Sequence, residues 1–232
     1  PRPPIRLLLL LQAEERTGRI TWRHASGERS LLLSAGLVVG AEGQPESFLE
    51  YLARTSGIAP GTLGRIERRV RDLFLPLERE VARATGLAPE EIAAARRDFT
   101  LAQIAELCLR EEDPQEIRFE DETMLMPGAA CQVPPATALA DLLMARIARD
   151  GGIPSFPDRI LRPTRLFPRL SVLLELAFPW RIHLPRAGGQ TAAQILEQCG
   201  TDRAAALYLL LAGGLLAEEP DPGRRRMPPT VL

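Results

Sequence analysis

The sequence contains no lysine and no asparagine, so all 29 of its basic residues are arginine. A P-loop needs a lysine on the nucleotide phosphates, and a Schiff-base enzyme needs a lysine amine. A protein kinase needs both a lysine on a strand and an asparagine that binds metal. These two absences exclude P-loop nucleotide hydrolases, Schiff-base enzymes and protein kinases.

Cysteine and histidine are also scarce. The three cysteines, Cys108, Cys131 and Cys199, are widely spaced and odd in number, a usage typical of a reducing compartment and not of a disulfide framework. A zinc site needs ligands at close spacing, and neither the cysteines nor His24 and His183 show it. Each histidine is interpreted as a residue at the edge of the core. We therefore expect no metal site, no cofactor and no catalytic residues.

Long apolar runs and a dominant charge are missing too. The longest run of leucine is only five residues, residues 7–11, whereas a membrane span needs about 20 apolar residues. The formal net charge is −1, which provides no general attraction to nucleic acid or to an anionic membrane. No signal-peptide pattern is present. With 45% hydrophobic residues the chain can form a core, and the sequence predicts a cytoplasmic protein.

What the sequence does contain is a clear strand pattern near its beginning. Residues 19–24 alternate between apolar and polar side chains, which indicates a half-buried strand. Short apolar runs at residues 31–33 and 37–39 predict two more strands, separated by turns at residues 25–28 and 35–36. Antiparallel strands joined by such short turns form a meander.

Helices are expected before and after this meander. Capping boxes, in which a hydroxyl and an acid or amide side chain cap one helix start, are predicted at Ser47, Thr100 and Thr191. Ile66, Val70, Leu73, Phe74 and Leu77 recur at helical spacing and predict one apolar helix face, and Pro76 should kink or end that helix. The expected helices cover residues 6–15, 47–57 and 63–76, with a further turn or two up to residue 86 and new helix starts at residues 88 and 100.

A second strand pattern, residues 115–122, follows these helices and is expected to pair with the meander. The sequence therefore predicts an α+β fold: an antiparallel sheet with a helical insert in residues 1–124, a linker in residues 125–136, and a mainly helical, winged-helix-like domain in residues 137–220. Residues 153–168 contain four prolines and predict an irregular connection. Residues 221–232 predict a flexible tail.

The first half resembles the PATAN domain, a bacterial signalling module named after the N-terminal part of a cyanobacterial response regulator. The stretches that carry the resemblance are "LLLLLQAEERTGRITW", "ERSLLLSAGLVVGAEG", "SFLEYLARTSGIAP" and "EIRFED". The motif positions are Thr17, Gly18, Ile20, Trp22, Ala35, Gly36, Val38, Val39 and Ala41. The end of the chain resembles the winged-helix-like segment that often follows such domains.

This resemblance implies a non-enzymatic module for contacts between proteins. Relatives are linked to two-component systems and, in some bacteria, to small Ras-like GTPases and cell motility. The family has no agreed catalytic residues, so none is transferred to this chain. The resemblance implies a signalling adaptor or scaffold whose partner is a small GTPase or a pathway regulator, and self-association stays open.

Two groups of polar residues are candidate partner contacts. One lies on the polar side of the first predicted strand, where an outer strand or a helix beside it can accept a partner. The other lies on the solvated side of the amphipathic helix that follows residue 63. The candidate partner-binding residues are Arg19, Thr21, Arg23, Arg65, Arg68 and Arg69.

A DNA-binding transcriptional regulator is the main alternative. The second helix of a helix-turn-helix must offer polar side chains to base edges. Here that helix is "DRAAALYLLL", and after Arg203 only Tyr208 carries any polarity. A helix this apolar is expected to be buried, so the sequence favours a protein partner over nucleic acid. An enzyme or nucleotide sensor is the third hypothesis.

Overall fold

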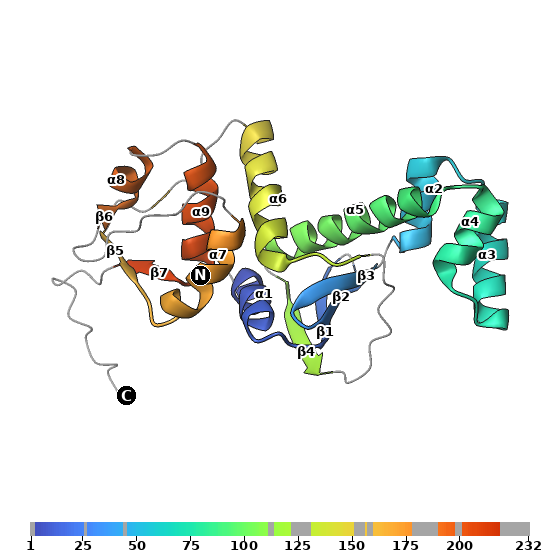
Figure 1. Cartoon of the computed structure of the whole chain (residues 1–232), viewed down its shortest axis with the longest axis horizontal. Helices are drawn as coiled ribbons and strands as arrows, with labels where there is room; N and C mark the ends of the chain where they lie inside the picture. Colours follow the sequence, from blue (N-terminus) through green and yellow to red (C-terminus); the bar gives the residue numbers. More distant parts are fainter. Residues whose placement is uncertain are drawn as a thin grey trace.

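A computed structural model shows an α+β fold, as the sequence predicts (Figure 1). It describes residues 3–25, 27–43, 46–110, 114–121, 131–150, 156, 160–177, 190–197 and 201–218. Within these ranges an antiparallel four-stranded sheet lies between two groups of helices, and a smaller three-stranded sheet lies near the end of the chain.

The larger sheet contains the predicted meander and the predicted closing strand. Its strands are β1 (Gly18–His24), β2 (Gly27–Ser34), β3 (Leu37–Gly43) and β4 (Glu116–Asp121). Their order in the sheet is β3-β2-β1-β4, and every neighbouring pair is antiparallel. Because β1 is central, its side chains have cross-strand neighbours on both sides: Thr21 lies between Ser30 and Arg118.

The turn between β2 and β3 links the sheet to the first helix. Ala35 and Gly36 both have positive φ, 47° and 78°, the backbone that two-residue hairpin turns of type I′ require. The Ala35 N–H donates to Thr17 Oγ1 at 3.0 Å, and the Gly36 N–H donates to the Arg16 carbonyl at 2.9 Å. A Cβ on Gly36 would lie 2.7 Å from the Gln12 carbonyl oxygen, so only glycine fits this close approach.

The first half contains α1 (Pro3–Ala13), α2 (Phe48–Ser56), α3 (Pro60–Leu73), α4 (Leu77–Thr85) and α5 (Pro89–Cys108). The predicted capping box before α2 is confirmed. The Glu50 N–H donates to Ser47 Oγ at 3.3 Å, and the Ser47 N–H donates to the Glu50 carboxylate at 2.7 Å. The helix before Pro76 ends at Leu73, three residues earlier than the expected break, and α4 starts directly after Pro76.

The predicted capping box at Thr100 is wrong, because α5 runs through this position without a break. Thr100 is fully buried, and its hydroxyl donates to the Arg96 carbonyl one turn earlier at 2.9 Å. The helix has already started at Pro89, where the Glu91 carboxylate accepts the Ala88 N–H at 2.7 Å. Threonine inside a helix can bond to a carbonyl of the preceding turn, so the pattern alone does not establish a helix start.

The second half contains α6 (Pro135–Asp150), β5 (Ile160–Pro163), α7 (Phe167–Ala177), β6 (Gln190–Thr191), α8 (Ala192–Glu197), α9 (Thr201–Ala212) and β7 (Leu216–Glu218). The expectation of an irregular connection over residues 153–168 is wrong for β5, which pairs with both β6 and β7. These partners come later in the chain, so local composition does not reveal them. The predicted capping box at Thr191 is confirmed, since the Gln194 N–H donates to its hydroxyl at 3.3 Å.

One continuous hydrophobic cluster joins the described parts of both halves. Its centre is α1, which packs against α5, α6, α7 and α9 (Figure 1). In the expected linker, Cys131 and Val133 are buried, and Val133 exchanges two backbone hydrogen bonds of 2.9 Å with Val38. The predicted domain boundaries stay a prediction, and the expected tail, residues 221–232, lies outside the described residues together with Cys199 and His183.

Candidate functional site

The first group of predicted contacts lies on the outer face of the large sheet. The alternation in β1 is confirmed: Arg19, Thr21 and Arg23 are at least partly exposed, whereas Ile20, Trp22 and His24 are buried on the opposite face. Trp22 and His24 therefore belong to the core side of the sheet.

Carboxylates of β3 and β4 pair with the arginines of this face. Arg19 contacts Glu42 at 2.7 Å, and Glu116 accepts hydrogen bonds from Arg23 at 2.5 Å and from Arg118 at 2.7 Å. These hydrogen bonds lower the pKa of the Glu116 carboxyl. Charges of both signs surround a shallow cavity of about 220 Å³ at this site. The outer face is therefore internally compensated and has no marked preference for a partner of one charge.

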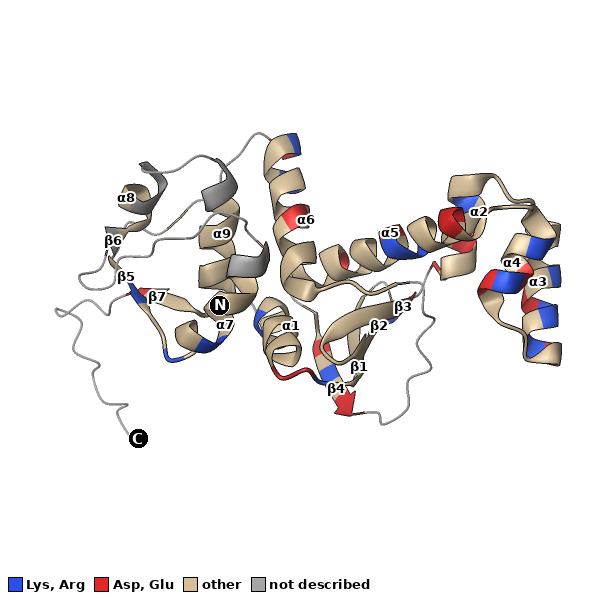
Figure 2. Ribbon diagram, viewed as in Figure 1, with Lys and Arg blue, Asp and Glu red and all other residues tan. Residues whose placement is uncertain are grey.

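The second group lies on a helical hairpin that projects from the sheet. We call residues 60–85, which form α3 and α4, the arm. It contains six arginines and four carboxylates, although the whole chain has a net charge of −1. Figure 2 shows the arginine positions along both helices, and Figure 1 shows the arm at one end of the molecule. The arm is thus a locally basic region of a nearly neutral protein.

Four arginines of the arm line one pocket. The pocket has a volume of about 480 Å³. We call it the arginine pocket; it is lined by Arg65, Ile66, Arg68, Arg69, Arg83 and Ala84. The structure therefore brings the three arginines predicted on α3 together, and it adds Arg83, which sequence reasoning missed. Arg83 lies on α4 and reaches the pocket because α3 and α4 fold back on each other after Pro76.

Glu80 holds one side of the arginine pocket in place. Its side chain is only 5% exposed, and its carboxylate accepts hydrogen bonds from Arg69 Nε at 2.7 Å and from Arg83 Nη2 at 3.0 Å. These two hydrogen bonds lower the pKa of the Glu80 carboxyl. A buried charge that is paired twice is firmly positioned, so Glu80 fixes two of the four guanidinium groups.

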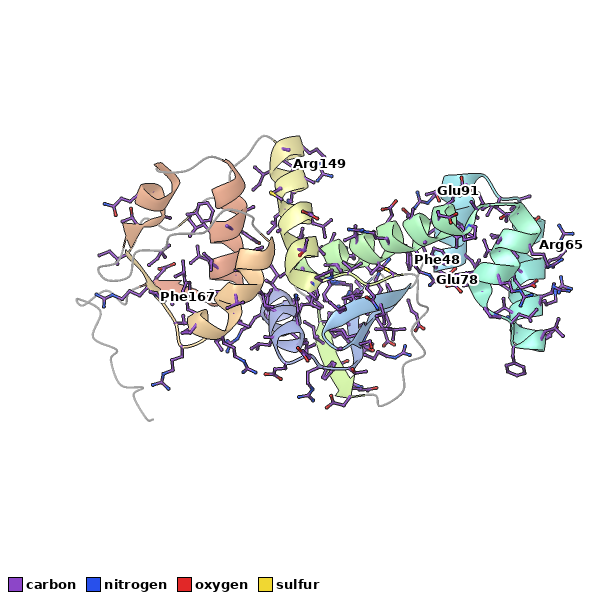
Figure 3. The ribbon with its side chains drawn as sticks, viewed as in Figure 1. Phe48, Arg65, Glu78, Glu91, Arg149 and Phe167 are labelled. Carbon is purple, nitrogen blue, oxygen red and sulfur yellow. The ribbon has the colours of Figure 1, made fainter. Side chains whose placement is uncertain are left out.

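The other two guanidinium groups have neutral partners. Arg65 donates to Thr62 Oγ1 at 3.1 Å, and Arg68 Nε lies 3.4 Å from the Gly64 carbonyl oxygen. Within the described residues, neither side chain forms an ion pair. Arg65 and Arg68 are both exposed, and Figure 3 shows Arg65 directed away from the rest of the molecule. The arginine pocket therefore presents two exposed guanidinium groups that form no ion pair with the described residues.

An exposed apolar tip follows the pocket along α3. Leu73 is 55% exposed and Phe74 is 93% exposed. The helical spacing predicted both on the apolar face with Ile66, and this prediction is wrong. Ile66 is buried, but α3 ends at Leu73, and Phe74 has a left-handed backbone with φ of 50°. Phe74 therefore leaves the helical pattern, whereas Leu73 is the last helical residue and is exposed at the end of α3.

Arg96 of α5 connects the arm to α2. Its guanidinium lies 3.9 Å from the centre of the Phe48 ring on α2 and 2.6 Å from Glu78 Oε1 on α4. Figure 3 shows Phe48 and Glu78 at this junction. Only 17% of the Arg96 side chain is exposed, so a cation–π contact and an ion pair act together in a shielded place.

The helix that would contact DNA in the alternative hypothesis is buried. Ala204–Leu207, Leu209 and Leu210 of α9 are at most 2% exposed, as the sequence predicts for so apolar a helix. The segment order β6, α8, α9, β7 contains two helices between two strands, and β5 pairs with both strands. The winged-helix interpretation of this region stays a prediction.

Within the described ranges, no three His, Cys, Asp or Glu residues gather in a way that would suit a metal ion. None of the described helices has the length and apolar composition needed to cross a bilayer.

Comparison with family models, with curated proteins and with solved structures finds no match for this chain.

Proposed function

We propose that this protein is a non-enzymatic adaptor of bacterial signalling that works in the cytoplasm and binds another protein through its arm. The observation that carries the proposal is Phe74, which is 93% exposed at the end of α3, the helix that supplies three of the four arginines of the arginine pocket. The resemblance to PATAN domains supports the signalling role and suggests a small Ras-like GTPase or a pathway regulator as the partner.

The tip has the composition of an interface centre. Aromatic residues and arginine are enriched where proteins bind each other, and a few such residues supply most of the binding energy. A left-handed backbone costs a residue other than glycine about 1–2 kcal/mol, and strain of this kind is concentrated at functional sites. Phe74 combines this strain with almost complete exposure. Burial against a partner would remove its apolar surface from water.

The proposal can be tested by photo-cross-linking in the native cells. The photoreactive residue p-benzoylphenylalanine replaces Phe74 in one variant and Val172 in a second. Val172 is a suitable control because it is an apolar residue of α7 that is 55% exposed. We expect a discrete protein adduct from position 74 and none from position 172.

The adduct is then identified, and its binding is reproduced with purified proteins by calorimetry. We expect Phe74→Ser to weaken binding at least tenfold and Val172→Ser to leave it unchanged. The proposal is wrong if position 74 gives no adduct, if both positions give the same adducts, or if Phe74→Ser binds as tightly as the wild type.

A further inference from the structure

We infer that the arm binds an acidic segment of its partner, with a carboxylate in the arginine pocket and an apolar side chain on the tip formed by Leu73 and Phe74. This inference rests on the proposed function and adds the chemistry of the partner. The inference is carried by the exposed guanidinium groups of Arg65 and Arg68, whose described partners are neutral oxygens, and by the exposed tip at the end of the same helix.

The charges of the pocket favour a carboxylate. Glu80 already pairs with Arg69 and Arg83, so those two groups are positioned but partly neutralised. Arg65 and Arg68 have only the neutral oxygens of Thr62 and Gly64 as described partners. A guanidinium offers a planar fork of donors that matches a carboxylate with two hydrogen bonds. A carboxylate of the partner can therefore accept hydrogen bonds from Arg65 and Arg68, which form no ion pair with a carboxylate of the described residues.

The tip follows the pocket along α3. Residues three or four apart are neighbours on a helix surface, so Arg65 adjoins Arg68 and Arg69, and Arg69 in turn adjoins Leu73. With a rise of 1.5 Å per residue, Arg65 and Leu73 are about 12 Å apart along the helix axis. A matching segment needs its carboxylate and its apolar side chain about eight residues apart if it is helical, or about four residues apart if it is extended.

The same features favour a protein segment over nucleic acid. Nucleic acid binding needs many phosphate contacts and a clearly positive surface. The arm carries Glu67 and Asp72 among its arginines, and these carboxylates would repel a continuous phosphate backbone. A protein segment needs only one or two charged groups, and it can also cover an exposed phenylalanine.

The inference is tested by selecting random twelve-residue peptides displayed on phage against the whole 232-residue chain. Three variants are screened beside the wild type: Arg65→Gln/Arg68→Gln, Phe74→Ser and Arg71→Gln. Arg71 is an exposed arginine of α3 that does not line the pocket, so its replacement is the matched control. Equal melting temperatures and circular dichroism spectra confirm that every variant is folded.

We expect the wild type to enrich peptides that carry aspartate or glutamate about four or eight residues from a large apolar side chain. Synthetic copies of these peptides should bind at least tenfold more weakly to Arg65→Gln/Arg68→Gln and to Phe74→Ser. Their binding to Arg71→Gln should stay within twofold of the wild type, and binding to the wild type should weaken as the salt concentration rises.

Other outcomes would overturn the inference. Enriched peptides that are neutral or basic and depend on Phe74 alone would disprove the acidic partner but leave the proposed function intact. Peptides that bind equally well to the wild type, to Arg65→Gln/Arg68→Gln and to Phe74→Ser would count against both the inference and the proposed function. A single-stranded or duplex oligonucleotide that displaces the peptides through Arg65 and Arg68 would identify a nucleic acid site. A dimer that Phe74→Ser dissociates in sedimentation would identify a second copy of this chain as the partner.

Discussion

At the scale of single residues, the two adjacent turn residues between β2 and β3 differ in which side chains their positions can accommodate. Ala35 adopts a left-handed backbone that alanine tolerates at a cost of about 1–2 kcal/mol. Gly36 adopts the same backbone without this cost, and it also lies against the end of α1. A substitution of Ala35 can therefore increase the stability of the protein, whereas a substitution of Gly36 can only decrease it.

Substitutions in this turn should have opposite effects on stability. Ala35→Asn creates the Asn-Gly pair that type I′ turns favour and should raise the free energy of unfolding by about 1 kcal/mol. Gly36→Ala should lower it by about 1–3 kcal/mol, because its Cβ would contact Gln12. Urea unfolding followed by circular dichroism measures both values. An equal midpoint for the two variants would contradict the described turn.

At the scale of whole elements, α5 joins the arm to the sheet through a few side chains. Phe99 is fully buried, and its ring centre lies 5.9 Å from that of Phe48 and 5.4 Å from that of Tyr51, both on α2. Arg96 adds its contacts with Phe48 and Glu78 one turn earlier. The orientation of the arm thus depends on a small aromatic and charged junction.

Phe99→Ala should destabilise the protein by about 3–5 kcal/mol, the usual cost of removing a buried aromatic ring. The loss combines the apolar surface of the ring with the cavity left between α2 and α5. Chemical unfolding measures the change. A loss below about 1 kcal/mol would show that Phe99 is not a central core residue.

Arg96→Met should loosen the arm and leave the sheet intact. Methionine retains much of the apolar stem but loses both the cation–π contact and the ion pair, which together contribute about 1–3 kcal/mol in a shielded site. Hydrogen exchange should therefore become faster in α3 and α4 but not in β1 or β2. Arg97→Met, an exposed neighbour on the same helix, is the control and should exchange like the wild type.

The sequence predicted those elements whose signals are local. The alternation in β1 correctly put Trp22 and Arg23 on opposite faces of the strand, because a strand repeats every two residues, but which of the two faces belongs to the core is shown only by the structure. Strand β5 was missed, since its partners β6 and β7 lie far along the chain and its composition is typical of a loop. The exposure of Phe74 was missed because the helical pattern continues past the residue where the helix ends.

The candidate site was predictable only in part, for the same reason. Arg65, Arg68 and Arg69 could be placed on one side of α3 from their spacing alone. Arg83 could not, since its distance from them depends on how α3 and α4 pack after Pro76. The pairing of Arg19 and Arg23 with carboxylates depends on the register between strands, which the sequence of a single strand does not contain.

At the scale of the whole molecule, paired carboxylates determine how stability changes with pH. Hydrogen bonds from arginine lower the pKa of Glu80, of Glu116 and of Asp121 in the folded protein. A lowered pKa stabilises the fold at every pH above the unfolded value of about 4, and this contribution disappears as the pH falls through the folded value. These three groups therefore favour the folded state at neutral pH.

The buried thiol of Cys131 acts at the opposite end of the pH scale. Burial raises its pKa, so its contribution to stability is present below the unfolded value of about 8.5 and is lost as the pH rises through the folded value. We expect these four groups to give a melting temperature that is level between about pH 5 and pH 8 and falls on both sides. Glu116→Gln should reduce the acid slope. An unchanged slope would mean that the pairing with Arg23 and Arg118 contributes nothing to the pH dependence.

Helix α5 also determines how far the arm lies from the rest of the molecule. Its 20 residues correspond to about 30 Å along the helix axis, and in Figure 1 the arm and the sheet β6-β5-β7 lie at opposite ends of the molecule. A protein bound at one end therefore leaves the other end free for a second protein at the same time. In such a bridging arrangement, two weak attachments would reinforce each other, since each one raises the effective concentration of the other.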